Sequence, residues 1–174
     1  MKRIVIIRHG EFSDEGETKG HLSEFGLAQM AAAANHIKNQ FLGKTLIIAA
    51  PTVLMKESAF VIKSFLEINS KIIEDERWKP GLLEDDKEKK EAVSDLLKKA
   101  ENYDLIIIVT NGKNIAALPQ FFAHHPNLKN YILKSESQED GAFGIDFVRD
   151  KFGCEIRWNP ETLELVLEEI FLPN

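Results

Sequence analysis

The sequence is poor in several features that mark specialised classes of protein. It has one cysteine, Cys154, so it can form no internal disulfide and offers no cysteine cluster for a metal. No basic tract stands out and the formal net charge is −6, so we expect no nucleic-acid partner. The apolar run at residues 4–7 is too short for a secretion signal or a membrane span. We therefore expect a cytoplasmic protein that does not bind membranes.

Internal repeats, low-complexity tracts and linker-like segments are also missing from the chain. A length of 174 residues, 44% of them hydrophobic, is enough to build one core. The sequence predicts a single domain over residues 1–174, and it leaves the oligomeric state open.

A dense group of phosphate-binding chemistry follows the first apolar run. Residues 4–7 read Ile-Val-Ile-Ile, which predicts a buried parallel strand, and open α/β sheets bind ligands at the carboxyl ends of such strands. There His9 can act as a nucleophile toward phosphorus, Arg8 offers donors matched to phosphate oxygens, and Gly10 permits close approach of a ligand. The alternative is that Arg8 and His9 belong to a loop ion pair.

Two later segments extend this pattern. Residues 20–29 read GHLSEFGLAQ, and a second predicted strand leads into AAP at residues 49–51. In order and spacing, these segments resemble the histidine phosphatase superfamily, which includes the cofactor-dependent phosphoglycerate mutases and the phosphohistidine phosphatases. The family pattern is Arg-His-Gly-Glu after a strand, Gly-x-Leu-Ser/Thr-Glu-x-Gly-x-x-Gln, Ser-x-Pro-x-x-Arg at a helix start, and a later strand ending in His-Gly. The resemblance covers about the first 120 residues.

The resemblance implies a three-layer α/β/α fold whose central sheet is mostly parallel, with antiparallel strands at its C-terminal edge. It implies that His9 becomes phosphohistidine and that Arg8 binds the phosphoryl group, without a metal or other cofactor. The ligand would be a small phosphorylated molecule or a phosphoprotein. The residues expected to line the pocket are Gly10, Glu11, Gly20, Ser23, Leu54 and Gly112.

Two positions depart from the family pattern. Leu54 stands where the family has its second phosphate-binding arginine, and Lys56 should leave the helix in another direction. Asn111 stands where the family has its second histidine; it can donate a hydrogen bond to phosphate but cannot carry the charge of an imidazolium. The sequence leaves open whether Lys113, Arg77 or Lys79 supplies the missing charge.

Glu84 stands near the position of the family's proton donor, in Leu-x-Glu. Asp85 and Asp86 follow it, so the three residues serve equally well as the acidic start of a helix. Both interpretations of Glu84, as proton donor and as part of a helix start, remain open.

In the rest of the sequence, predicted strands alternate with predicted helices until the C-terminal third, where the pattern predicts strands alone. A polar segment, residues 135–141, corresponds to one that can close over substrate in the family. The adjacent histidines 124 and 125 lack ligand spacing and suggest surface residues instead of a metal site. Strands are expected at 3–7, 45–49, 71–74, 104–110, 142–148, 154–158 and 163–169, and helices at 24–40, 51–68, 85–101 and 113–123.

Three hypotheses about function follow. The first is reduced or altered phosphoryl transfer through His9, and the second is an inactive relative that binds a phosphorylated ligand or a protein. The third is an unrelated α/β protein in which the motif is a coincidence. The family hypotheses make a geometric prediction, which is that distant residues converge on one strand-end crevice. These residues are Arg8, His9, Ala50, Leu54, Glu84 and Asn111.

Overall fold

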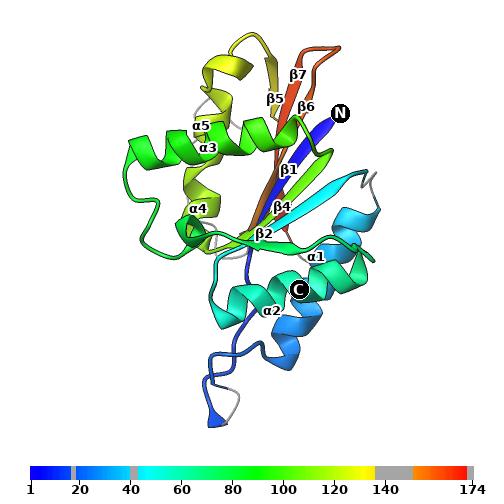
Figure 1. Cartoon of the computed structure of the whole chain (residues 1–174), viewed down its shortest axis with the longest axis vertical. Helices are drawn as coiled ribbons and strands as arrows, with labels where there is room; N and C mark the ends of the chain where they lie inside the picture. Colours follow the sequence, from blue (N-terminus) through cyan, green and yellow to red (C-terminus); the bar gives the residue numbers. More distant parts are fainter. Residues whose placement is uncertain (17–18, 40–42, 136–150, 172–174) are drawn as a thin grey trace.

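A mixed seven-stranded sheet forms the centre of the computed structural model, which describes residues 1–16, 19–39, 43–135 and 151–171 (Figure 1). The order of strands across the sheet is β3-β2-β4-β1-β6-β7-β5. The strands are β1 (Lys2–Arg8), β2 (Thr45–Ala49), β3 (Ile72–Glu74), β4 (Leu105–Thr110), β5 (Ile132–Ser135), β6 (Lys151–Asn159) and β7 (Glu164–Phe171).

The strands on one side of the sheet are parallel, as the apolar runs predict. β1 pairs in parallel with β4, β4 with β2, and β2 with β3. β6 is antiparallel to both β1 and β7, which confirms the predicted C-terminal hairpin. The edge strand β5, which the sequence did not predict, runs parallel to β7. The expected strand at 142–148 and most of the expected closing segment at 135–141 lie outside the described residues.

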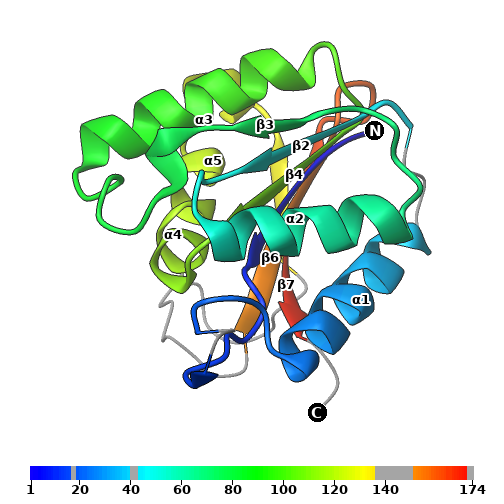
Figure 2. The same ribbon diagram turned by 60° about the horizontal axis from the view of Figure 1, so that its bottom comes forward.

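Five α-helices cover the two faces of the sheet within the described ranges (Figure 2). α1 and α2 pack on one face, and α3, α4 and α5 on the other, so the predicted three-layer fold is confirmed. Two short 3₁₀ turns, η2 (Glu76–Trp78) and η3 (Pro126–Leu128), lie in the connections. The helices are α1 (Glu24–Lys38), α2 (Val53–Phe65), α3 (Asp86–Ala100), α4 (Gly112–Ala117) and α5 (Pro119–Ala123).

Helix boundaries follow capping chemistry that is legible in the sequence. The Ser23 hydroxyl caps α1 by accepting a bond from the Gly26 amide at 3.0 Å, and Asp85 forms a capping box with Glu88 at the start of α3. The helix expected near 113–123 is instead two short helices, because Pro119 has no amide hydrogen to continue the first. α2 ends at Phe65, three residues before the expected end.

The middle of the sheet is fully buried. All four residues of the run 4–7 in β1 and all five of 105–109 in β4 have no exposed surface. Burying one such side chain stabilises the fold by about 1.5–3 kcal/mol, so these two strands contribute strongly to the free energy of unfolding. Cys154 is buried in β6, as expected of a packed strand residue. No helix within the described ranges is long and apolar enough to span a membrane.

Candidate functional site

The carboxyl ends of three neighbouring strands bring the first group of predicted site residues together. In the parallel register Arg8 pairs with Thr110, so His9 and Asn111 leave the sheet side by side. The His9 amide donates to the Thr110 carbonyl at 3.1 Å. β2 lies on the other side of β4, and Ala50 follows its end. The expected meeting of His9, Asn111 and Ala50 at one end of the sheet is therefore correct.

Two glycines let the loop after β1 lie directly on α1. A Cβ on Gly10 would lie 2.6 Å from the Gly26 carbonyl oxygen, and a Cβ on Gly26 would collide with the carbonyl oxygen of Glu11. No other residue type fits at either position without moving backbone. The glycines of the two sequence motifs thus have a packing reason, which is close contact between the motifs.

Hydrogen bonds hold the same loop against both helices. The Gly10 amide donates to the Ser58 hydroxyl at 3.2 Å, and that hydroxyl donates to the Leu54 carbonyl at 2.8 Å. The Glu11 amide donates to the Gln29 side-chain oxygen at 2.8 Å. The loop that carries His9 is therefore fixed by α1 on one side and by α2 on the other.

Three expected pocket residues have observed contacts that stabilise this loop. The Ser23 hydroxyl donates to the Glu11 carboxylate at 3.1 Å, and the Ser23 amide donates to the Glu11 carbonyl at 3.0 Å. Gly20 lies in an exposed turn with φ of +82°, a left-handed conformation that favours glycine, and its amide donates to Ser13. Lining of the pocket by Glu11, Ser23 and Gly20 stays a prediction.

The ring of His9 is held in one tautomer. Its Nδ1 lies 2.9 Å from the Gly10 carbonyl oxygen, and a carbonyl can only accept, so Nδ1 carries the hydrogen. Nε2 of the neutral ring then has a free lone pair. Burial lowers the pKa of His9, the bond to the Gly10 carbonyl partly opposes this, and the Arg8 charge lowers it further. The ring is thus neutral, with an available nitrogen, near pH 7.

The two polar residues beside His9 differ in their surroundings. The Arg8 side chain is exposed and makes no hydrogen bond or ion pair with any residue in the described ranges. Asn111 is buried, and its oxygen caps α4 by accepting from the amides of Lys113 at 2.9 Å and Asn114 at 3.3 Å. The Asn111 Nδ2 is buried and has no hydrogen-bond partner in the described ranges. Gly112, another residue predicted to line the pocket, is the first residue of α4.

Leu54 lies half-buried in the first turn of α2. Lys56, two residues on, forms an ion pair with Glu74 at 3.7 Å. This ion pair is consistent with the prediction that Lys56 does not replace the missing arginine. The first turn of α2 therefore has an apolar residue where the family pattern has a charge.

Glu84 precedes the cap of α3. Its amide donates to the Glu88 carboxylate at 3.1 Å, and its carbonyl accepts from the Lys89 ammonium at 2.7 Å. The carboxylate of Glu84 is exposed and bonds to no residue in the part of the chain that the structure describes. The capping role belongs to Asp85, so the contacts leave the Glu84 carboxylate available.

Solved structures share this architecture, although no family model and no curated protein matches the sequence. The protein histidine phosphatase SixA complexed with tungstate superposes with a TM-score of 0.59 at 13% identity, over 97% of this chain and 96% of that one. A mycobacterial glucosyl-3-phosphoglycerate phosphatase gives 0.61 at 13% identity over 100% of both chains. Phosphoglycerate mutase from Plasmodium falciparum gives 0.57 at 15% identity, over 97% of this chain and 89% of that one.

The chain has the histidine phosphatase fold. The predicted resemblance is confirmed at the level of the fold. The structural similarity extends over nearly the whole chain, whereas the sequence motifs cover only about the first 120 residues.

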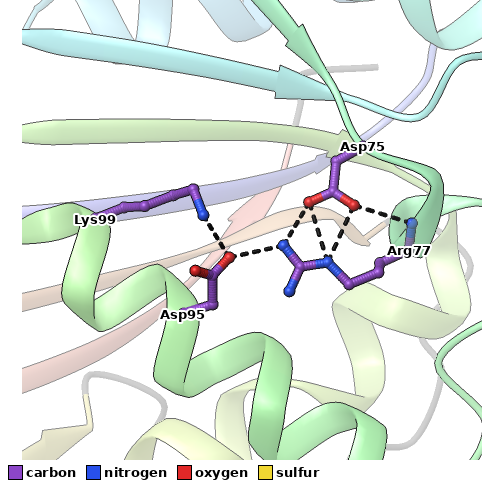
Figure 3. A network of polar contacts seen from close by, with 4 residues as sticks. All are labelled: Asp75, Arg77, Asp95 and Lys99. Carbon is purple, nitrogen blue, oxygen red and sulfur yellow. Dashed lines mark hydrogen bonds and ion pairs between the residues drawn. The ribbon is translucent and has the colours of Figure 1, made fainter.

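Within this histidine phosphatase fold, two of the three spare cations considered from the sequence are already paired. The Arg77 guanidinium lies between two carboxylates, 2.5 Å from Asp75 and 2.7 Å from Asp95, and Lys99 also contacts Asp95 (Figure 3). The bond from Asp75 does most to raise the pKa of Arg77 above its ordinary value. Lys79 pairs with Glu76 at 2.5 Å.

A groove of about 560 Å³ lies on the α1 and α2 side of the sheet, beside the edge strand β3. His21 and Glu57 both line it; the His21 Nδ1 lies at hydrogen-bond distance, 2.6 Å, from one Glu57 oxygen, and the second oxygen accepts from the Leu22 amide at 2.9 Å. No local pattern in the sequence marks Glu57, because it meets His21 only through folding. The residues that line the groove are His21, Leu22, Leu27, Lys56, Glu57, Phe60, Val61, Ile72 and Glu74.

No group of three or more histidine, cysteine or carboxylate side chains within the described ranges is arranged to hold a metal ion. His125 bonds through Nε2 to the Ser94 hydroxyl at 2.9 Å, and His124 is exposed. The absence of a metal requirement stays a prediction that experiment has to test.

Proposed function

We propose that this chain transfers a phosphoryl group through His9, slowly and without a metal, from a small phosphorylated molecule or a phosphoprotein. The observation that carries the proposal is the bond from His9 Nδ1 to the Gly10 carbonyl. It leaves Nε2 of a neutral ring free to attack phosphorus, which is what nucleophilic catalysis by histidine requires. The fold shared with phosphatases and a mutase supports the same chemistry.

The proposed reaction has two steps. Nε2 of His9 bonds to phosphorus while the bond from phosphorus to the leaving oxygen breaks, and the Glu84 carboxyl group gives that oxygen a proton. Water then attacks phosphorus and gives a proton to the Glu84 carboxylate while the bond from phosphorus to Nε2 breaks, which releases inorganic phosphate and restores neutral His9 and protonated Glu84. Arg8 stabilises the charge on the transferring group, since charge placement supplies most of the catalysis in phosphoryl transfer.

The rate should be low because the crevice lacks two groups of the family pattern. Leu54 and Asn111 replace an arginine and a histidine, and hydrogen bonds to charged groups are worth roughly 1.5–3 kcal/mol each. Losing two of them corresponds to a decrease on the order of 10²- to 10⁴-fold in rate.

A reactive aryl phosphate tests the proposal. We expect slow turnover by the wild type and none by His9→Ala, whereas His124→Ala, which changes an exposed histidine, should match the wild type. Labelled phosphate trapped on the wild type should be acid-labile and absent from His9→Ala. Glu84→Gln should slow turnover while phosphate binding persists, and chelators should have no effect. Activity that a chelator abolishes and a metal restores would contradict the metal-independent mechanism.

The same two substitutions favour a second candidate, which is a protein that binds a phosphorylated ligand or a protein partner without catalysis. Leu54 adds apolar surface, and Asn111 cannot carry the charge of an imidazolium. These two residues should therefore weaken the binding of a phosphorylated ligand less than they slow the transfer of its phosphoryl group. No turnover and no phosphohistidine in the wild type, together with measurable phosphate binding, would favour this second candidate.

A further inference from the structure

Among the described residues, few positive charges around the proposed site at His9 are left unpaired to bind an anion. Arg77, Lys79 and Lys56, on the elements around it, each pair with at least one carboxylate. Lys89, on α3, bonds to the Glu84 carbonyl and lies 3.7 Å from an Asp86 oxygen. A pairing carboxylate cancels most of the field that a cation would exert on a phosphate. These four side chains are therefore poor replacements for the missing arginine.

Lys113 is different from all four. It follows the end of β4 by three residues, and its side chain is exposed. It makes no side-chain hydrogen bond or ion pair with the part of the chain that the structure describes. Its backbone is fixed, because its amide donates to the Asn111 side-chain oxygen at 2.9 Å. The result is a free ammonium group on a rigidly held backbone.

Lys113 follows a strand end that lies directly beside His9. The Thr110 carbonyl accepts from the His9 amide at 3.1 Å, and Lys113 follows Thr110 within one turn. A lysine has a flexible four-carbon stem that can carry its charge toward a group held beside that turn. The Asn111 Nδ2, buried in the same turn, has no acceptor among the residues that the structure describes. An uncommitted ammonium and an unsatisfied amide donor on one turn both suit an oxyanion.

We propose that Lys113 is the second cation of the phosphate site and contacts the phosphoryl group held at His9. The proposal rests on the proposed function, whose site it completes. Lysine offers a point charge instead of the planar fork of arginine, so Lys113 neutralises the phosphoryl group without fixing its orientation. Arg8 then remains the group that orients it.

The test measures binding of inorganic phosphate by calorimetry to the whole chain and three variants. Lys113→Met should weaken binding by about tenfold or more, the value of one lost charge-assisted hydrogen bond. Lys113→Arg should retain most of the affinity. Lys129→Met is the matched control, because Lys129 is also exposed and without a partner in the described ranges, but it precedes β5 at the opposite end of the sheet.

Chemical modification gives a second measurement that does not depend on turnover. Phosphate should protect Lys113, but not Lys129, from reductive methylation. Because Lys113 is exposed, Lys113→Met should unfold at the wild-type temperature, so lost binding can be separated from misfolding.

The outcomes separate this inference from the proposed function. If phosphate binding depends on Lys113 but no phosphohistidine forms, the inference stands and the catalytic proposal fails. If phosphohistidine forms on His9 and Lys113→Met binds phosphate as well as the wild type, the catalytic proposal stands and Lys113 is not the second cation. A wild type that binds no phosphate at all overturns the inference as well.

Discussion

The two sides of the proposed site, at the carboxyl ends of β1, β2 and β4, are built by different means. On the β1 side, Gly10 and Gly26 touch backbone to backbone, and hydrogen bonds fix the loop that carries Arg8 and His9. On the β2 and β4 side, Asn111 caps a helix and Leu54 lies in the first turn of another. The first side has the residues of the family pattern, whereas the second has uncharged residues where that pattern has an arginine and a histidine. The fold requires the glycines, whereas the charged groups on the second side are not needed for folding.

The largest effect should come from making the second side resemble the family. Leu54→Arg and Asn111→His together should raise the aryl phosphatase rate on the order of 10²- to 10⁴-fold, since each adds a charged contact to one transferring group. The pair should gain more than the two single variants predict by addition, because both act on the same phosphoryl group. Steady-state kinetics of all four proteins measures this. A folded double variant with the wild-type rate would count against the catalytic role of the crevice.

On the β1 side, one added methyl group at Gly26 should be enough to destabilise the fold. Gly26→Ala places a Cβ against the Glu11 carbonyl, which must move, so we expect a loss of roughly 3 kcal/mol in the free energy of unfolding. Urea denaturation gives the value, and Ala28→Ser, an exposed change on the same helix, should have little effect. An unchanged midpoint for Gly26→Ala would mean that the contact between the motifs is not tight.

Fold and site were predictable from sequence to different degrees. The runs at 4–7 and 105–109 and the cap at Ser23 are local signals, and they gave the central strands and α1 correctly. The edge strand β5 was missed because four residues paired to one neighbour carry a weak pattern. The pairing of Arg77 with Asp95 depends on tertiary packing of η2 against α3, which no local periodicity encodes.

The protonation of His9 gives a third prediction, of intermediate size. Its pKa is lowered, chiefly by burial, so activity should fall about tenfold per pH unit only below the ordinary value of about 6.5. The stability of the fold should change with pH in the same direction. The folded state favours the neutral ring of His9, so the stabilisation is present above the unfolded pKa and is lost as pH falls through the folded pKa. NMR titration of the ring measures the pKa directly, and Arg8→Gln should raise it. A His9 pKa above 6.5 would contradict the neutral nucleophile.

The smallest effect concerns Glu57, which joins the Leu22 segment to α2 and so links the two sides. Burial raises its pKa, but the bonds from Leu22 and His21 outweigh burial and the net shift is downward. Its contribution to stability is therefore present above the unfolded pKa and is lost as pH falls through the folded pKa. Because the pair is partly exposed, Glu57→Gln should cost less than about 1 kcal/mol. Thermal unfolding at neutral and acid pH compares the two proteins.

The place of β1 in the sheet bears on how the protein folds during synthesis. β1 lies between β4 and β6, and Arg3 pairs with both Leu105 and Arg157. The strand that leads into His9 is therefore synthesised long before either of its neighbours in the sheet. Such distant pairings slow folding and leave apolar strands exposed to aggregation meanwhile. The run Ile4-Val5-Ile6-Ile7 is then the segment that a nascent chain most needs to shield, and chaperone contacts during translation should concentrate there.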